Sequence, residues 1–331
     1  MKPLRGAQPG LFEALESFLR QDYGGPMQLV LGLHDAADPA AAVAERLRRE
    51  HPQADIEVVI DGRVHGTNGK VSNLINMLEV ARHELLIISD ADITVAPDYL
   101  SRVAAAAGLR DVGAVTCFYR GQGQAGFWSR LAAMGVSYGF LPNVVLGMAL
   151  GLANPCMGST IALDRRLLDE IGGLEAFADV LADDYEIGRA VRARGLRVAV
   201  PPLAVTHGCA ERRFGELVAH ELRWAVTIRR MDPLGHAGSV ITHPLPLAVL
   251  AAACLGFGPL SVIAICVALA ARLWLIRCVD GATGVDARDW PLLPLRDFVS
   301  FGVFVWSLFA RNVSWGGTRF AVSSDGKLTA A

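Results

Sequence analysis

A long apolar tract in the last third of the chain constrains its fold more than any other feature. The 35 residues 245–279 carry only two charged side chains, and the turn signal Gly-Phe-Gly-Pro at 256–259 divides them. The tract therefore predicts a helical hairpin. Its second arm, 260–276, would be about 25 Å long, near the lower limit for crossing a hydrocarbon core about 30 Å thick. We expect a membrane region over residues 238–331.

Two further apolar segments accompany this hairpin. Residues 298–310 would form a helix only about 20 Å long, which favours an interfacial or re-entrant segment unless residues 292–295 extend it. Residues 127–152 carry no charge after Arg130, but five glycine and proline residues interrupt them. This pattern favours a helix that lies on the membrane surface or lines a pocket, with a buried core helix as the alternative.

Composition excludes several classes of protein. Hydrophobic residues make up 52% and charged residues 19% of the 331 residues, which excludes a disordered chain. The 31 basic and 33 acidic residues give a net charge of -2, so a nucleic-acid partner is not expected. The six cysteines form no Cys-x-x-Cys pair, which argues against a zinc site or a disulfide framework and favours a reducing compartment.

The N-terminal two thirds show the pattern of an α/β domain, which we expect over residues 1–237. Continuous apolar runs alternate with helical stretches, as in a mainly parallel sheet whose strands are buried on both faces. Residues 1–10 are polar, so they predict neither a signal peptide nor a strand, and the first strand of the sheet is expected to be missing. The predicted strands are 28–33, 56–60, 85–89 and 112–117, and the predicted helices are 9–20, 38–50, 71–82, 97–107, 185–194 and 214–230.

Two aspartates directly follow the strand predicted over 85–89. Asp90 and Asp92 lie at the carboxyl end of a buried strand, which is the edge at which α/β sheets bind ligands. Their spacing lets both carboxylates reach one ligand. Hard oxygen donors of this kind suit Mg²⁺ or Mn²⁺ together with a nucleotide diphosphate. The alternative is a pair of solvated turn residues.

Further acidic residues occupy similar places in the sequence. Asp35 follows the strand 28–33 and could accept a hydrogen bond from a nucleobase or a ribose, the alternative being a turn or helix-cap aspartate. Asp183 and Asp184 precede the helix predicted over 185–194. One of these two is a candidate general base, with simple N-capping as the alternative.

The helix 214–230, just before the apolar tract, carries the last candidate group. His220, Arg223 and Trp224 are spaced i, i+3 and i+4, so they share one helix face. A guanidinium group binds a diphosphate well, and an aromatic side chain could form a wall beside it. Taken singly, a Trp at this spacing is usually a core residue and an Arg is usually solvated.

Together, the aspartate after a strand, the Asp-x-Asp triplet, the acidic pair before Tyr185 and the Arg-Trp motif before apolar helices resemble a known family. They are similar to the ceramide glucosyltransferase-like enzymes, glycosyltransferase family 21, and within them to bacterial hopanoid-biosynthesis glycosyltransferases. The sequence departs from that family at His220, where Gln or Arg is usual, and in its missing N-terminal anchor and first strand. Supporting stretches are KPLRG at 2–6, GTNGKVSNL at 66–74, ADDYE at 182–186 and SW at 314–315.

The resemblance implies a GT-A fold, Rossmann-like with a mainly parallel sheet, followed by C-terminal transmembrane or interfacial helices. It implies a multi-pass protein of the bacterial inner (cytoplasmic) membrane with its catalytic domain on the cytosolic side. The implied reaction moves a sugar, with inversion, from a UDP-sugar to a lipid hydroxyl, with Mg²⁺ or Mn²⁺ as cofactor. Within this family we expect UDP-N-acetylglucosamine as the donor and a hopanoid polyol, bacteriohopanetetrol, as the acceptor, because the loop residues resemble the bacterial hopanoid branch most.

The resemblance also implies roles for individual residues. Asp184 would be the catalytic base, with Asp183 as a further candidate. Asp90 and Asp92 would hold the metal and contact the ribose and diphosphate of the donor. The other donor-binding residues would be Asp35 at the uridine, Lys70 near the nucleotide, and Arg223 and Trp224 on the diphosphate and acceptor side, with His220 as a possible addition.

Three other interpretations fit parts of the sequence. A ceramide glucosyltransferase, or another glycolipid synthase, would share the motifs and differ in sugar and acceptor. A processive polysaccharide synthase would share the Asp-x-Asp and Arg-Trp elements, but two or three apolar segments are few for a transmembrane channel. A non-catalytic membrane subunit or pseudoenzyme is suggested by the missing first strand and by His220.

Overall fold

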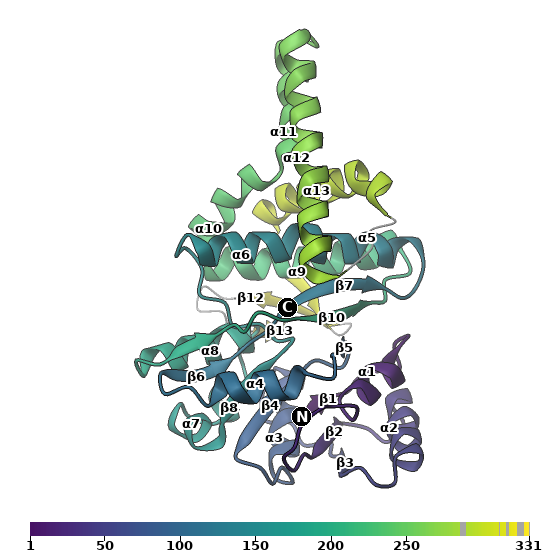
Figure 1. The fold of residues 1–331 in the computed structure, drawn as a ribbon, viewed down its shortest axis with the longest axis vertical. Coiled ribbons are helices and arrows are strands. Elements are labelled where there is room, and N and C mark those ends of the chain that lie inside the picture. Colours follow the sequence, from purple (N-terminus) through teal and green to yellow (C-terminus); the bar gives the residue numbers. More distant parts are fainter. Residues whose placement is uncertain (285–288, 311, 316–317, 323–327, 331) are drawn as a thin grey trace. The chain divides into compact units, whose positions relative to one another are not determined.

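The computed structural model describes residues 1–284, 289–310, 312–315, 318–322 and 328–330 (Figure 1). The chain divides into two compact units. The first consists of Met1–Tyr119 and Asn154–Gly208, and the second consists of Arg120–Ala153 and Cys209–Ala331. This division differs from the predicted boundary at residues 237/238, because the segment from 120 and the helix from 214 pack with the C-terminal apolar helices.

The first unit contains a parallel sheet in which β1 (Lys2–Pro3), β2 (Leu29–Leu33) and β3 (Ile56–Ile60) lie in that order. β1 pairs in parallel with β2, with Lys2 opposite Leu31. The prediction that the sheet lacks a strand before its first helix was therefore wrong. Two residues are enough to pair with the edge of β2, but they are too few to produce a periodic sequence pattern.

A second sheet of the first unit is mixed. Its order is β4 (Leu85–Ile88), β8 (Ile161–Asp164), β6 (Val112–Val115) and β9 (Arg197–Ala199). β8 runs antiparallel to both of its neighbours, whereas β6 and β9 are parallel. β5 (Ile93–Thr94) follows β4 along the chain and pairs antiparallel with β10 (Ala204–Cys209), so that His207 lies opposite Ile93. β7 (Phe118–Gly123) completes the strands of this part of the chain.

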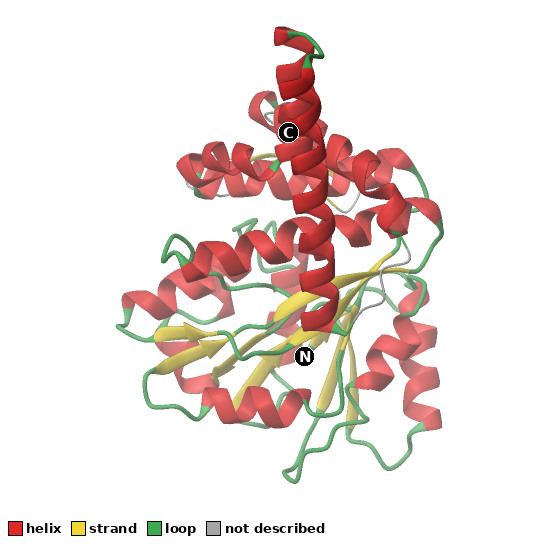
Figure 2. Ribbon diagram, turned by 45° about the horizontal axis from the view of Figure 1, so that its top comes forward, coloured by secondary structure: helices red, strands yellow, loops and turns green. Residues whose placement is uncertain are grey.

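Helices flank these strands, which Figure 2 shows in yellow. The second helix has a side-chain cap at its N-terminus, because Asp38 accepts a hydrogen bond from the N–H of Ala40. Apolar residues of the third helix and of the second sheet share one buried core cluster, which includes Leu74, Ile88 and Ile161. The helices of the first unit are α1 (Leu11–Ser17), α2 (Pro39–Glu50), α3 (Gly69–Leu78), α4 (Tyr99–Ala107), α7 (Arg165–Glu170), the 3₁₀ turn η2 (Leu174–Phe177) and α8 (Asp183–Ala193).

The second unit is mainly helical. Its elements are α5 (Phe127–Gly135), the π turn η1 (Val136–Phe140), α6 (Leu141–Ala149), α9 (Phe214–Met231), α10 (Pro233–Gly238), η3 (Ser239–Thr242), α11 (Pro244–Leu255), α12 (Pro259–Thr283), η4 (Trp290–Leu292) and α13 (Leu293–Phe309), followed by the antiparallel strands β11 (Asn312–Trp315), β12 (Thr318–Val322) and β13 (Leu328–Ala330). The glycine and proline residues do not break the first apolar segment, which is helical from 127 to 149. Pro142 is tolerated because it stands at the start of α6, after the π turn.

The helical hairpin predicted over 245–279 is confirmed as α11 and α12. Its second arm has 25 residues, more than expected, and η4 with α13 extends the segment predicted over 298–310 back to Trp290. Within the described residues, three helices, 127–149, 259–283 and 290–309, are long and apolar enough to cross a membrane. The segments 233–242 and 244–255 together form a fourth candidate, bent by 72° at their junction.

Candidate active site

The Asp-x-Asp segment of the first unit connects β4 to β5 and presents its two carboxylates to different partners. Asp90 Oδ1 lies 2.8 Å from the Lys70 ammonium nitrogen. Asp92 Oδ1 lies 3.4 Å from His207 Nδ1, and the N–H of Gly208 donates to the backbone carbonyl of Asp92. Convergence of both carboxylates on one ligand stays a prediction. The contact with His207 could not be found from the sequence, because β10 lies more than a hundred residues further along the chain.

Lys70 is positioned by the loop that precedes α3. In this loop Gly66 leaves no room for a side chain, because a Cβ there would lie 2.5 Å from the carbonyl oxygen of Ala178. Asn68 caps α3 by accepting from the N–H of Val71, and its amide donates to the carbonyl of Val180 at 2.7 Å. The loop is thus fixed to the residues just before α8. As a result the Lys70 ammonium lies 3.3 Å from Asp183 Oδ2 as well as next to Asp90.

Asp183 and Asp184 are the first two residues of α8, and Ala182 is the capping residue. The prediction that the acidic pair precedes the helix was wrong by two residues. Both oxygens of the Asp184 carboxylate accept hydrogen bonds from backbone N–H groups, one from Tyr185 at 2.8 Å and one from Gly158 at 2.9 Å. Two such bonds fix the orientation of the carboxylate.

Gly158 is a site residue that sequence reasoning missed. A Cβ at this position would lie 3.2 Å from Asp90 Oδ2, 3.3 Å from Lys70 Nζ and 3.4 Å from Asp184 Oδ2. The backbone of Gly158 is therefore the point at which these three side chains come together. The Gly-Ser-Thr run at 158–160 was the signal that the sequence offered. Buried hydrogen bonds of Thr116, Ser89 and Ser159 hold this segment in place.

The charges of this cluster shift its proton affinities. Burial raises the pKa of the Asp184 carboxyl to about 6; the charges of Asp183 and Asp90 act in the same direction, and Lys70 and the Tyr185 N–H oppose them. Burial also raises the pKa of Asp90. Burial alone would lower the pKa of Lys70, but the surrounding carboxylates together raise it above its usual value. Lys70 therefore stays protonated near neutral pH, while Asp184 can exchange a proton there.

The donor atoms suit a hard divalent cation. Three carboxylates, those of Asp90, Asp183 and Asp184, surround one ammonium group, which leaves an excess of negative charge. No three His, Cys, Asp or Glu side chains among the described residues form a complete metal site by themselves. Mg²⁺ commonly uses only one or two carboxylates together with waters and substrate phosphates, so a complete set of protein ligands is not required. A metal site formed by Asp90 and Asp92 stays a prediction.

Asp35 stands at the end of β2, as predicted, and is exposed to solvent. Its Oδ1 accepts a hydrogen bond from the N–H of Ala37, which is the geometry of an Asx turn. The neighbouring His34 connects this edge to the Lys70 region, because its Nε2 lies 2.8 Å from the carbonyl oxygen of Gly69. Contact of Asp35 with a nucleotide stays a prediction.

His220, Arg223 and Trp224 lie in the second unit, on one face of α9 as predicted. His220 Nδ1 lies 2.7 Å from Oε1 of the buried Glu211, and its ring packs edge-on against Trp224 with the centroids 4.5 Å apart. The hydroxyl of Thr227 donates to the carbonyl of Arg223. Glu211 was missed by sequence reasoning, although it orients the residue that departs from the family pattern.

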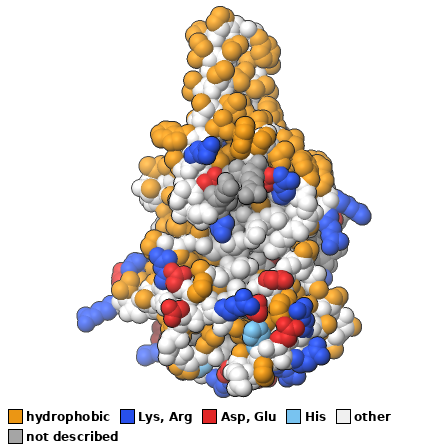
Figure 3. Space-filling view, turned by 45° about the vertical axis from the view of Figure 1, so that its right-hand side comes forward, with side chains coloured by type: hydrophobic (Ala, Val, Ile, Leu, Met, Phe, Trp, Pro, Cys, Tyr) orange, Lys and Arg blue, Asp and Glu red, His pale blue; other side chains and the backbone are white. Residues whose placement is uncertain are grey.

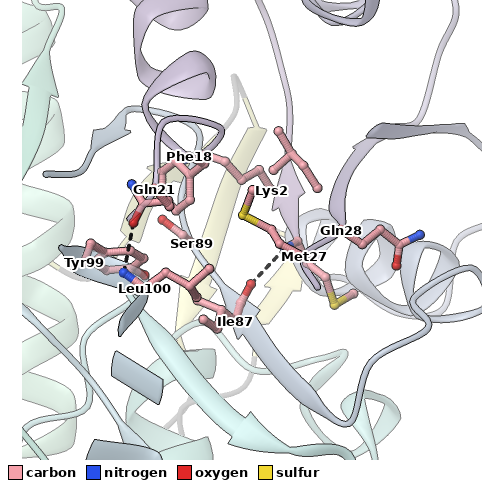
Figure 4. Close-up of a pocket in the computed structure, with 11 residues that line it drawn as sticks. Lys2, Phe18, Gln21, Met27, Gln28, Ile87, Ser89, Tyr99 and Leu100 are labelled. Carbon is pink, nitrogen blue, oxygen red and sulfur yellow. Dashed lines mark hydrogen bonds between the residues drawn. The ribbon is translucent and has the colours of Figure 1, made fainter. Parts of the chain in front are cut away.

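A small cavity of about 60 Å³ lies behind the Asp-x-Asp segment, and Lys2, Phe18, Ser89 and Tyr99 are among its lining residues (Figure 4). It is far smaller than the roughly 300–1,000 Å³ of typical ligand pockets, so it is not a nucleotide site. The buried Lys2 ammonium donates to the carbonyl of Ile93, the residue after Asp92, and lies 3.7 Å from the ring centroid of Phe18. Burial lowers the pKa of Lys2 to about 7, while Asp92 and Asp90 oppose this shift.

Comparison with known proteins gives relatives of known activity. The chain is 24% identical to Ceramide glucosyltransferase 1 of Caenorhabditis elegans over 341 residues, which cover 99% of this chain and 72% of that protein. It is 27% identical to Ceramide glucosyltransferase 3 of the same organism over 209 residues, which cover 60% of this chain and 43% of that protein.

One solved structure shares the fold. The structure of the mannosyltransferase PcManGT from Pyrobaculum calidifontis, in complex with GDP-Man and Mn²⁺, matches 93% of this chain and 86% of its own chain with a TM-score of 0.55 and 21% sequence identity. The predicted GT-A-like α/β fold with C-terminal apolar helices is thereby confirmed. The family model described as Glycosyl transferase family 21 matches residues 1–328. The chain therefore belongs to glycosyltransferase family 21 and is a glycosyltransferase.

Proposed function

We propose that this enzyme transfers a sugar from a UDP-sugar to a hydroxyl group of a membrane lipid in a single displacement with inversion. The observation that carries the proposal is the buried cluster of Asp90, Lys70, Asp183 and Asp184 around Gly158. A cluster with an oriented carboxylate whose pKa is about 6, beside a protonated lysine, can remove a proton from an alcohol near neutral pH.

In this mechanism Asp184 takes the proton of the lipid hydroxyl as its oxygen attacks the anomeric carbon of the sugar. The bond from that carbon to the diphosphate oxygen breaks, and UDP leaves with the electron pair. The N–H groups of Gly158 and Tyr185 hold the carboxylate in one orientation. The Lys70 ammonium balances the charges of Asp90 and Asp183, so it serves as a fixed positive charge and not as a base.

Mg²⁺ or Mn²⁺ held by Asp90 and Asp92 would supply positive charge to the diphosphate. Asp35 is proposed to contact the uridine. Arg223 and Trp224 are proposed to hold the diphosphate and the acceptor, with His220 as a further contact, and these assignments rest on the family motif. The relative solved with GDP-Man and Mn²⁺ supports the use of a nucleotide sugar and a divalent metal.

Within this class we propose N-acetylglucosamine and bacteriohopanetetrol as sugar and acceptor, from the resemblance to the bacterial hopanoid branch. The names of the Caenorhabditis elegans relatives favour a second candidate, glucose transfer to ceramide. We propose that the first unit faces the cytosol at a bacterial cytoplasmic membrane. Six free cysteines among the described residues, three of them exposed, support a reducing compartment.

The test is turnover by membranes that contain the full chain. UDP-N-acetylglucosamine and UDP-glucose are each offered with bacteriohopanetetrol or ceramide, with Mg²⁺, Mn²⁺ or a chelator. We expect metal-dependent glycosylation of one lipid. Asp184→Asn should lower kcat at least about a hundredfold and keep donor binding, because general-base catalysis is worth 10²–10⁴ in rate.

The matched control is Asp169→Asn, the same substitution at an exposed position. It should leave kcat unchanged. Normal turnover by Asp184→Asn would contradict the assignment of the base. If no lipid is glycosylated and no UDP-sugar binds, the non-catalytic interpretation replaces the proposal.

A further inference from the structure

The α11–α12 hairpin of the second unit is apolar around its whole tip. From Pro244 to Ala271 it carries no charged side chain. Leu255, Phe257 and Leu260 at the turn are 85%, 68% and 83% exposed. Hydrophobic side chains cover the projecting hairpin in the space-filling view (Figure 3). A surface of this kind needs an apolar partner.

The apolar parts of the two hairpin arms differ in length by one residue. α11 has 12 residues, which corresponds to about 18 Å. In α12, the 13 residues 259–271 precede the first charge, Arg272, and correspond to about 20 Å. A hydrocarbon core is about 30 Å thick, so neither apolar arm is long enough to cross it.

The base of the hairpin is fixed by polar contacts within the second unit. Arg272 makes two hydrogen bonds to the Asp297 carboxylate, at 2.8 and 2.9 Å, and a third to the carbonyl of Tyr138. The Tyr138 hydroxyl in turn donates to Asp280 of α12. Trp274 is 73% exposed at this level, and an indole ring there suits the headgroup region. The remainder of α12 therefore belongs to the polar side of the membrane boundary.

The other apolar helices of the second unit run crosswise to the hairpin. α5 with α6, and likewise α9, lie across the direction of α11 and α12 (Figures 1 and 2). α13 packs along α9. Arg296 of α13 pairs with Glu221 of α9, and Arg229 of α9 donates to the carbonyls of Leu308 and Ala310. The segment before α11 is bent from it by 72°. Helices that lie crosswise to an inserted hairpin cannot cross the same bilayer.

We infer that the hairpin enters the bilayer from one face, ends within the hydrocarbon core and returns to the same face. The second unit then contacts the membrane from one side only, with 127–149 and 290–309 lying along its surface. This inference rests on the proposed function and adds to it. The catalytic residues and the headgroups of the lipid acceptor would lie on the same side of the membrane. A chain that enters from one side forms no channel for a growing polymer. It replaces the multi-pass arrangement expected from the sequence.

The test is cysteine accessibility in the full chain. Cys254, Cys266 and Cys278 are changed to Ala, while the three buried cysteines are kept. Single cysteines are then introduced by Ala237→Cys before the hairpin, Phe257→Cys at its tip and Ala282→Cys after it. A membrane-impermeant maleimide is applied to spheroplasts, which expose the outer face, to inside-out vesicles, which expose the inner face, and to detergent-solubilised protein.

We expect the two flanking cysteines to be labelled from one and the same face. The tip cysteine should be labelled from neither face and only after detergent is added. Labelling of the tip from the face opposite to its flanks would mean that the hairpin crosses, and labelling from the same face would mean that it lies outside the bilayer; either result overturns the inference. Leu260→Cys gives a second tip position if Phe257→Cys does not fold. Labelling needs no turnover, so loss of the proposed function would leave this result intact.

Discussion

The carboxylate of Asp184 has its proton affinity set by neighbours from three separate segments. Burial and the charge of Asp183 raise its pKa to about 6, while Lys70 opposes them. A base must be unprotonated to act, so its active fraction grows as the pH rises through this value. Because neighbouring charges add to the effect of burial, the pKa can be changed without touching Asp184 itself.

The first prediction concerns pH. Below a pH of about 6, kcat/KM should fall about tenfold per unit, because the fraction of ionised Asp184 falls by that factor. In Asp183→Asn this acidic limb of the pH profile should move to lower pH, since the substitution removes a negative charge that disfavours the ionisation of Asp184. The pH profile of single-turnover rates measures both. A limb that stays in place in Asp183→Asn would show that another group is titrating.

A second prediction concerns Gly158. Its missing side chain leaves the space in which Asp90, Lys70 and Asp184 meet, and a methyl group would lie 3.2–3.4 Å from one atom of each. Gly158→Ala should therefore lower kcat by about 10- to 100-fold by displacing the carboxylates, with little change in thermal stability. Gly69→Ala is the control, because its Cβ would meet nothing within 4 Å. Equal activities of the two variants would contradict this role for Gly158.

At the level of elements, the loop before α3 connects two parts of the first unit. Asn68 is fully buried, caps α3 and donates to Val180, just before the residues that start α8. Thr67 adds a hydrogen bond from its N–H to Asp179. The loop thereby determines where the Lys70 ammonium lies relative to Asp183.

The third prediction follows from these contacts. Asn68→Ala removes the cap and leaves the Val180 carbonyl without this donor, so it should cost about 2 kcal/mol of stability and also lower kcat of the folded enzyme. Asp38→Ala removes the cap of α2, away from the cluster, and is the matched control. Thermal unfolding and kinetics on the same samples measure both effects. If the two variants lost stability equally and neither lost activity, the loop would have no role in positioning Lys70.

At the level of the whole molecule, each of the two units has its own set of buried charged side chains. The first unit gathers the acidic cluster, and the second unit holds the buried pairs Arg272–Asp297 and Arg296–Glu221 at the base of an apolar hairpin. Buried ion pairs favour one arrangement of the helices over others, because a mispaired charge in such a place is costly.

The fourth prediction concerns membrane attachment. Phe257→Arg places a charge at the hairpin tip, where the re-entrant arrangement puts hydrocarbon, and should cost about 3 kcal/mol, or about a hundredfold in partition into liposomes. Ala282→Arg, beyond the apolar part of α12, should leave partition unchanged. Co-sedimentation with liposomes measures both variants. Unaltered partition of Phe257→Arg would indicate that the tip lies in water and not in hydrocarbon, which contradicts the re-entrant arrangement.

Features that depend on residues adjacent in the chain could be predicted without the structure. Continuous apolar runs predicted β2, β3, β4 and β6, and the Gly-Phe-Gly-Pro turn predicted the hairpin, because local periodicity and turn residues encode such elements. The order of Asp90, Asp92 and Asp184 along the chain was enough to suggest a family and its chemistry. The length of α12 was underestimated because the predicted arm ended at residue 276, before the charge of Asp280. Asp280 is accommodated in α12 by a hydrogen bond from Tyr138, far away in the sequence.

Which side chains meet could be seen only after the chain had folded. Gly158, His207 and Glu211 carry no signal of their own, since each matters through a partner 26, 115 or 9 residues away. The two-residue β1, the antiparallel β8 and the division of the chain into two units likewise depend on pairings between distant segments. A local pattern fixes backbone conformation, but the proton affinity of Asp184 depends on burial and on charges that folding brings near.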